Sequence, residues 1–265
     1  MGDVIRLTTY VRFATADDST VRGGVLDGDV VREYTGCLFD GPSLAGRADR
    51  LTDVVLKAPL EPRHIIGIGK NFAAEGAAKP DAPELPILFF KPQTAVIGPG
   101  EPIVAPPGVR EVQFEAELAV VIGKRCRDIR PEDADSHIFG FTVANDVAVP
   151  GFFHPDGHWT IGKSFDTFCP LGPVLVTSFD YRNAGIQSRV NGAEKQNSSI
   201  ERIILPIDRM IAYISRFMTL QPGDVLLTGT PAGAGAVRDG DIVECRIEGI
   251  GSLVNPVRSS MSPQP

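Results

Sequence analysis

Short apolar segments alternate with glycine- and proline-rich turns along most of the chain. By composition and length, the expected strands are residues 9–14, 23–25, 30–31, 64–69, 87–90, 115–122, 141–146, 173–176, 187–190, 225–228 and 242–247. Strands of this length and spacing are typical of a β-sandwich or a barrel-like core. The pattern predicts a mainly β (α+β) fold, with a small N-terminal β domain at residues 1–60 and a larger domain at residues 61–265.

One segment has the period of a helix instead. Apolar residues recur on a single 3.6-residue face after Pro206, which is permitted in the first turn of a helix. They are Ile207, Met210, Ile211, Ile214, Phe217 and Met218. We expect this face to pack against the sheet. In contrast, the prolines between residues 70 and 86 prevent a long helix there, so this segment is predicted to be a mobile lid loop.

Composition restricts the classes of function. The 265 residues carry a formal net charge of -7, and no cluster of Lys and Arg is present, which argues against nucleic acid as a partner. The first ten residues lack the apolar stretch of a signal peptide, and apolar runs such as residues 118–123 are too short to span a bilayer. We expect a cytoplasmic protein with no membrane association. Its 4 cysteines form no CxxC pair, which favours free thiols.

Three carboxylates lie at the ends of apolar strands. Glu115 and Glu117 begin one strand, and strand alternation turns both side chains to the same face, roughly 7 Å apart. From Glu-x-Glu alone, surface salt bridges would be favoured. Asp146 adds a third acid at the end of another strand, and a hard divalent cation would relieve the repulsion among the three. The sequence therefore predicts a site for Mg²⁺, Mn²⁺ or Ca²⁺ at these residues.

Lys163 lies in a segment of small and aromatic residues between Trp159 and Pro173. Because Gly162 precedes it, this lysine can approach a metal site closely and stabilise an oxyanion or enolate beside the ion. A lone lysine would otherwise be a solvated charge. The triplet at residues 162–164 lacks the leading glycine and the strand–loop–helix context of a phosphate-binding loop. The segment therefore favours a catalytic role for Lys163.

Four segments carry motifs that occur together, in this order, in a known family. They are Phe114 to Gly123, Ala144 to Val147, Gly162 to Pro173, and Leu220 to Gly233, which contains Thr-Gly-Thr-Pro. Together they resemble the signatures of the fumarylacetoacetate hydrolase family, in particular its bacterial branch of 2-hydroxyhepta-2,4-diene-1,7-dioate isomerases and acylpyruvases. The likeness covers about residues 63 to 257.

The resemblance implies a mixed β-roll or β-sandwich core, a homodimer, and a divalent cation held by the three carboxylates. In that family the cation chelates the carboxylate and 2-oxo oxygens of a small oxo acid. The reaction is hydrolysis of a carbon–carbon bond, decarboxylation or keto–enol isomerisation, each through an enolate that the cation supports as a Lewis acid. The resemblance thus implies a substrate class and leaves three reactions open.

It also implies roles for other residues. Lys163 would stabilise developing negative charge. Thr230, through its hydroxyl and nearby backbone amides such as that of Gly229, would bind a substrate carboxylate or oxo group. Lys91 and Asn71 match positions near the family's site and are expected to contact the substrate.

The chain departs from the family pattern in the lid. Members usually carry Asn-Tyr-x-x-His-x-x-Glu, in which the His, oriented by the Glu, activates water. Here Glu75 stands at the His position and Ala78 at the Glu position. Glu75 could replace the base if it were desolvated, and His158 or His154 could do so with a pKa near neutrality. All three could equally be surface residues of their loops.

Apolar residues also replace polar ones near the predicted cation. The segment after Asp146 lacks the usual serine and arginine, and Ile161 stands where an arginine is usual. We therefore expect a less polar or less anionic substrate than the family average. The first hypothesis is a metal-dependent hydrolase or lyase that acts on a 2-oxo or 1,3-dicarbonyl acid through carbon–carbon bond hydrolysis or decarboxylation. Two alternatives remain open: a tautomerase, isomerase or cyclase, which the missing dyad favours, and a catalytically silent scaffold.

Overall fold

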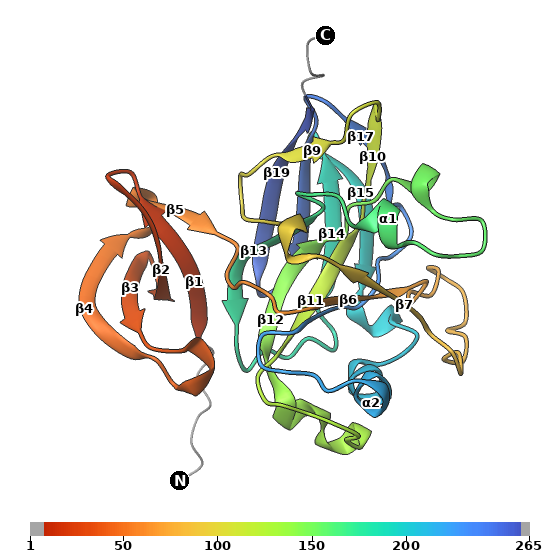
Figure 1. Cartoon of the computed structure of the whole chain (residues 1–265), viewed down its shortest axis with the longest axis horizontal. Coiled ribbons are helices and arrows are strands. Elements are labelled where there is room, and N and C mark those ends of the chain that lie inside the picture. The colour runs from red at the N-terminus through yellow and green to blue at the C-terminus, as the bar shows by residue number, and fades with distance from the viewer. Residues whose placement is uncertain (1–7, 261–265) are drawn as a thin grey trace.

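The strands of the described part of the chain form three sheets. The computed structural model describes residues 8–260 (Figure 1). The largest sheet has the order β4-β3-β2-β1-β13-β12-β11-β16-β6-β7, with β5 paired to β1 and β8 paired to β13. Its strands are β1 (Thr9–Thr15), β2 (Asp18–Asp27), β3 (Val30–Thr35), β4 (Ser43–Arg50), β5 (Val54–Lys57), β6 (Ile65–Gly69), β7 (Ile87–Lys91), β8 (Val96–Ile97), β11 (Ala116–Ile122), β12 (Ile138–Asn145), β13 (Cys169–Val176) and β16 (Val225–Leu227).

The other two sheets are smaller. The five-stranded sheet has the order β15-β14-β18-β19-β9. Its strands are β15 (Ala193–Ser199), β14 (Gly185–Val190), β18 (Ile242–Ile247), β19 (Gly251–Ser259) and β9 (Ile103–Ala105). The third sheet pairs β10 (Glu111–Phe114) with β17 (Gly235–Arg238). The predicted mainly β fold is confirmed.

Helices within residues 8–260 are short. The α-helices are α1 (Thr160–Lys163) and α2 (Ile207–Phe217), and the 3₁₀ helices are η1 (Leu38–Asp40), η2 (Leu51–Asp53), η3 (Gln93–Ala95), η4 (Pro131–His137), η5 (Pro150–Phe152) and η6 (Ile200–Arg202). Helix α2 buries Met210 and Ile214, and Met218 at its end packs against the core, but Phe217 is 60% exposed and does not belong to the predicted apolar face. None of the helices in this part of the chain is long and apolar enough to cross a membrane.

Strands β1 to β5 lie to one side of the other strands (Figure 1). Pairing of β1 with β13 joins them to the core, with Thr9 opposite Val176 and Tyr10 opposite Leu175. Phe13 of β1 is fully buried. The division of the chain between residues 60 and 61 stays a prediction.

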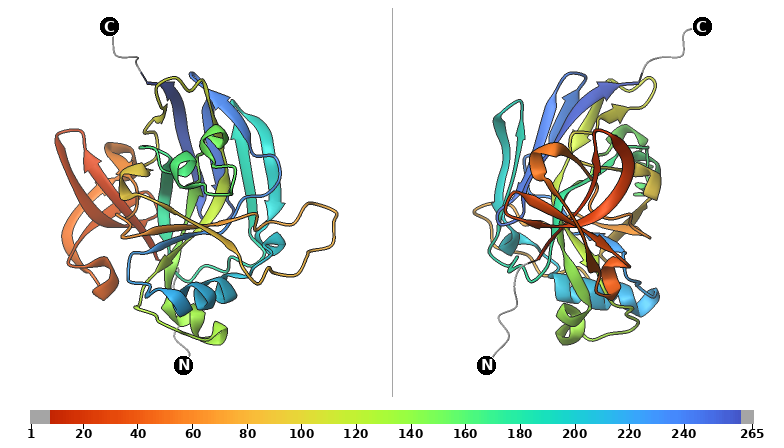
Figure 2. Two further views of the ribbon diagram at one scale, coloured as in Figure 1. Left: turned by 45° about the vertical axis from the view of Figure 1, so that its right-hand side comes forward. Right: turned by 90° about the vertical axis from the view of Figure 1, so that its left-hand side faces the viewer.

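Strand β11 is buried on both faces, which explains its uninterrupted apolar sequence. Leu118 and Val120 belong to a core cluster that includes Ile186 of the five-stranded sheet. Ala119 and Val121 belong to a second cluster on the other face. Figure 2 shows the five-stranded sheet, in cyan and blue, standing against β11 and β12. This packing fixes the strand ends beside which the acidic residues lie.

The predicted lid, residues 70–86, contains no helix or strand, apart from an isolated bridge between Phe72 and Ile203. It is docked on the segment around η6. The Arg202 guanidinium donates to the carbonyls of Ala74 and Ala77, and Lys79 Nζ donates to the Glu201 carbonyl at 3.2 Å. The predicted mobility of this loop stays a prediction.

Candidate metal centre and active site

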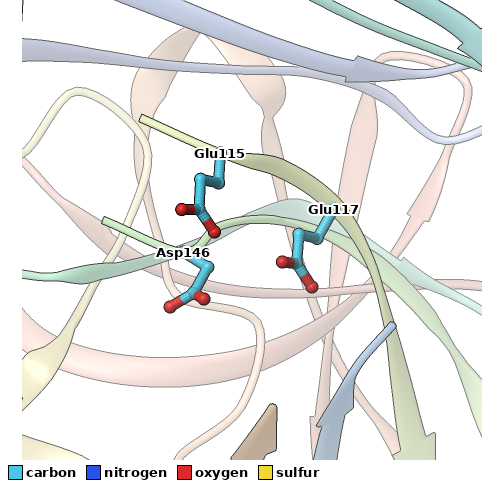
Figure 3. A group of neighbouring side chains, drawn as sticks. All are labelled: Glu115, Glu117 and Asp146. Carbon is cyan, nitrogen blue, oxygen red and sulfur yellow. The ribbon is translucent and has the colours of Figure 1, made fainter. Parts of the chain in front are cut away.

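Two paired strand ends bring the acidic residues together. Ala116 of β11 lies opposite Asn145 of β12, so Glu115 and Asp146 are the next residues outward. The Asp146 amide donates to the Glu115 carbonyl at 2.9 Å. One carboxylate oxygen from each of Glu115, Glu117 and Asp146 lies within 4.8 Å of the other two, and Figure 3 shows the three side chains as neighbours. The structure thus places the three predicted metal ligands side by side.

Two buried lysines offset part of this negative charge. Lys91 Nζ donates to Asp146 Oδ1 at 2.6 Å and to the Val147 carbonyl at 3.0 Å. Lys163 Nζ donates to Asp146 Oδ2 at 2.5 Å and to Glu115 Oε2 at 2.7 Å. Burial alone would raise the pKa of Asp146, but the two ammonium groups outweigh burial and lower it. Asp146 is therefore the carboxylate that the lysines hold ionised.

The negative charge of Glu117 is offset less than that of Asp146. It is 2% exposed, and its Oε2 accepts a hydrogen bond from the Gly229 amide at 2.7 Å. Burial raises the pKa of Glu117 well above its usual value, and the charges of Asp146 and Glu115 raise it further. Burial also raises the pKa of Glu115, despite the opposing charge of Lys163. The site thus holds more carboxylate than its lysines neutralise.

Lys163 reaches the carboxylates from the single turn of α1. A Cβ atom on Gly162 would lie 2.5 Å from the Phe153 ring and 2.7 Å from the Val149 carbonyl oxygen, so only glycine allows this close approach. Lys163 Nζ also lies 5.1 Å from the centre of the Phe89 ring. Gly162 therefore explains how Lys163 comes to lie between an aromatic ring and the acidic residues.

A cavity of about 260 Å³ opens onto these groups. Its lining is Ile68, Gly69, Lys70, Phe89, Gln113, Glu115, Glu117, Asp146, Phe153, Trp159, Lys163, Gly229 and Thr230. Trp159 packs between the two other aromatic residues of the lining, because its ring centre lies 5.4 Å from that of Phe153 and 5.8 Å from that of Phe89. A small cavity with aromatic walls and a few grouped polar atoms suits a small organic acid.

The sequence matches a known family over most of its length. The family model described as "Fumarylacetoacetate (FAA) hydrolase C-terminal" matches residues 64–258. The chain belongs to the fumarylacetoacetate hydrolase family. A second family model, described as "Rv2993c-like, N-terminal", matches residues 9–59.

Relatives in the fumarylacetoacetate hydrolase family include different kinds of enzyme. The crystal structure of 2-hydroxyhepta-2,4-diene-1,7-dioate isomerase from Mycobacterium marinum matches with a TM-score of 0.87 and 38% identity, covering 96% of this chain and 100% of that one. Oxaloacetate tautomerase fahd2, mitochondrial, from Xenopus laevis is 43% identical over 220 residues, 78% of this chain and 69% of that protein. Maleylpyruvate hydrolase from Sphingobium sp. SYK-6, in complex with manganese (II) ion and pyruvate, matches with a TM-score of 0.79 and 30% identity, covering 96% of this chain and 100% of that one.

The acidic residues fit the divalent cation on which this family's enzymes depend. All three offer carboxylate oxygen, the donor that hard cations prefer. Because their oxygens lie within 4.8 Å of one another, one ion can contact all three at the usual distances of about 2.0–2.6 Å. The excess of buried carboxylate described above also favours a cation. Its identity as Mg²⁺, Mn²⁺ or Ca²⁺ remains a proposal.

Thr230 and Gly229 line the cavity, but their polar atoms have partners within the protein. Thr230 Oγ1 donates to the Ala116 carbonyl at 2.8 Å and accepts from Gln196 Nε2 at 2.8 Å. The Gly229 amide is used by Glu117. In this structure these groups shape the site, and their contact with a substrate stays a prediction.

Asn71 and Lys91 are not among the cavity-lining residues. The Asn71 side chain accepts from the Leu205 amide at 2.7 Å and donates to the Thr228 carbonyl at 2.9 Å. The side chain of Lys91 is fully buried against Asp146. In this structure both side chains make contacts within the protein, and their contact with a substrate stays a prediction.

The predicted substitute bases lie away from the cavity lining. Glu75 is exposed and accepts a hydrogen bond from Ser198 Oγ. His158 and His154 are also exposed, with ring centres 6.1 Å apart. The structure does not bring any of the three to the carboxylates, which agrees with the alternative reading of all three as surface residues of their loops.

Sequence reasoning missed seven of the cavity-lining residues, and the polar or largest of them are Lys70, Gln113 and Trp159. Gln113 Nε2 donates to Glu115 Oε1 at 2.9 Å, and its place two residues before Glu115 was an available signal, since alternate residues share a face of a strand. Lys70 is the first charged residue after the buried strand β6. The position of Trp159 depends on the docking of α1 and has no local signal.

The hydrogen bond from Gly229 to Glu117 gives a first prediction. Gly229 has a φ of 99°, and an added Cβ would lie 2.9 Å from Asn71 Cβ. The change Gly229→Ala should displace the amide and weaken Mn²⁺ binding about 10- to 100-fold, as loss of support for a ligand usually does. Calorimetric titration with Mn²⁺ measures this. The control is Gly240→Ala, where φ is 89° but an added Cβ meets nothing within 4 Å; equal affinities in the two variants would contradict the prediction.

Proposed function

We propose that the protein is a divalent-metal-dependent tautomerase of the isomerase type, which interconverts the keto and enol forms of a 2-oxo acid. The observation that carries this proposal is the placement of Lys163, which both contacts the acidic residues and lines the cavity. This arrangement stabilises an enolate, the intermediate of such a reaction. No water-activating base is needed, because the reaction neither consumes nor releases water.

The reaction moves one proton. A base, for which water suffices, takes a proton from the carbon beside the carbonyl group. The electron pair of that carbon–hydrogen bond forms the carbon–carbon double bond, the π electrons of the carbonyl group move to its oxygen, and a proton is then returned to that oxygen. A divalent cation at the acidic residues supplies Lewis acidity for the developing negative charge. Lys163 holds a positive charge beside the same acidic residues, and the aromatic rings of Phe89, Phe153 and Trp159 form the apolar part of the cavity lining.

The charges at the site support an anionic substrate. When ionised, Glu115, Glu117 and Asp146 exceed the two lysines by one negative charge. A divalent cation reverses the sign and leaves one net positive charge in a buried site, which favours binding of a carboxylate. The oxaloacetate tautomerase relative from Xenopus laevis, 43% identical over 220 residues, makes oxaloacetate the first substrate to test.

The test is proton NMR of the Mg²⁺-loaded protein with oxaloacetate in D₂O, beside a blank with Mg²⁺ alone. We expect faster keto–enol interconversion and faster exchange of the C3 hydrogens than in the blank, with no added release of pyruvate. Asp146→Ala serves as the control that removes a proposed metal ligand.

Cleavage is the second candidate function, because the maleylpyruvate hydrolase with a TM-score of 0.79 has the same fold. Metal-dependent pyruvate release above the blank would replace the tautomerase proposal by carbon–carbon cleavage or decarboxylation. Acylpyruvates, tested in the same way, would then separate cleavage of a diketone from loss of carbon dioxide.

A further inference from the structure

Lys70 is a charged group at the cavity to which the chemistry above gives no role. The charged residues among the lining are Lys70, Lys163 and the three acids. Lys163 is bound to Asp146 and Glu115. Within residues 8–260, no ion pair or hydrogen bond involves the Lys70 ammonium group, and Lys70 is exposed at the rim of the cavity. Lys70 thus brings a positive charge to the cavity that no carboxylate of this part of the chain offsets.

The backbone at Lys70 is held in an unusual conformation. Its φ of 55° lies in the left-handed region, which glycine and asparagine adopt more readily than lysine. Both neighbours are fixed: a Cβ on Gly69 would lie 2.2 Å from the Trp159 ring, and the Asn71 side chain is bound to Leu205 and Thr228. A lysine at a position that strains it suggests that the side chain has a function.

The cavity therefore offers two separate positive features to a substrate. One is the cation site with Lys163, which suits the carboxylate and 2-oxo oxygens. The other is Lys70. We propose that Lys70 binds the second carboxylate of the substrate and makes the enzyme selective for a short 2-oxo dicarboxylate. This inference rests on the proposed function, and it reverses the expectation from sequence of a less anionic substrate.

The experiment compares oxaloacetate with its 4-methyl ester, which keeps the 2-oxo acid but lacks the second negative charge. The variants are Lys70→Asn, which suits the left-handed backbone, and Lys70→Arg, which keeps the charge. The control is Lys124→Met, at an exposed lysine beyond the far end of β11. Rates of C3 hydrogen exchange give KM and kcat for each substrate.

For Lys70→Asn, we expect the KM for oxaloacetate to rise about 10- to 100-fold, the loss typical of one charge-assisted hydrogen bond. Its kcat and both constants for the ester should change less than about 3-fold. Lys70→Arg should restore most of the affinity for oxaloacetate, and Lys124→Met should match the wild type. Equal loss with both substrates, or loss confined to kcat, would show that Lys70 does not bind the second carboxylate.

A failure of the proposed function remains distinguishable. If the wild type exchanges neither substrate faster than the Mg²⁺ blank, the tautomerase proposal fails. Binding of the same two compounds to the Mn²⁺-loaded protein, followed by water proton relaxation, then tests Lys70 alone. A preference for oxaloacetate over the ester that Lys70→Asn abolishes would support the selectivity, and the absence of such a preference in the wild type would overturn it.

Discussion

Replacement of Lys163 by methionine is expected to lower kcat for the tautomerase reaction by about 10²- to 10³-fold, the usual effect of removing one group that stabilises an oxyanion. Methionine keeps much of the buried volume and removes the charge. Lys163 is 2% exposed and donates to Asp146 Oδ2 and Glu115 Oε2, so it also competes with a cation for these oxygens. Mn²⁺ affinity should therefore be unchanged or higher in the variant while turnover falls.

A fall in turnover without a fall in Mn²⁺ affinity would distinguish a catalytic role of Lys163 from a structural one. Turnover is measured by C3 hydrogen exchange of oxaloacetate, Mn²⁺ binding by calorimetry, and folding by urea denaturation. Lys124→Met, an exposed change of the same chemistry, is the matched control and should resemble the wild type in all three. A kcat within about 3-fold of the wild type would show that Lys163 stabilises no charge in the transition state. Loss of both metal affinity and turnover would point to a structural role instead.

The parts of the fold that the sequence predicted well depend on local patterns. The strand expected at residues 187–190 forms as part of β14, and it ends at the turn Asn191-Gly192, where the φ values are 52° and 81° and Val190 is paired to Ala193. Strand β19 was missed because Pro256 interrupts its pattern. In the structure, pairing with β9 begins only at Val257, so on that side the missing amide of Pro256 is not needed.

In the candidate site, too, local sequence patterns indicate some residues and not others. The acidic residues could be found because each lies beside the end of an apolar strand, although β11 begins at Ala116, one residue later than predicted. The ion pair between Lys91 and Asp146 could not be found from the sequence, because it joins residues that are 55 positions apart. The position of Glu75 depends on how its loop docks, which no local pattern encodes. The homodimer and the cytoplasmic location stay predictions.

Asp146→Ala is expected to have the largest effect on both folding and metal binding. Asp146 is completely buried and accepts hydrogen bonds from Lys91 and Lys163 at 2.6 and 2.5 Å. Removing it leaves Lys91 buried without a carboxylate partner among the described residues, while Lys163 keeps Glu115. Loss of one partner of a buried ion pair typically lowers the free energy of unfolding by about 3–5 kcal/mol. Mn²⁺ affinity should fall by more than about 100-fold, since a direct ligand matters more than its support.

A double variant tests this explanation. In Asp146→Ala with Lys91→Met, the unpaired buried cation is gone, so urea denaturation should show recovery of at least about 1 kcal/mol relative to Asp146→Ala. Mn²⁺ binding should stay lost, because the second change restores no ligand. If the double variant were no more stable than the single one, the instability would come from the cavity left by the aspartate and not from Lys91. If Asp146→Ala still bound Mn²⁺ as the wild type does, the cation would not be held by the three acidic residues.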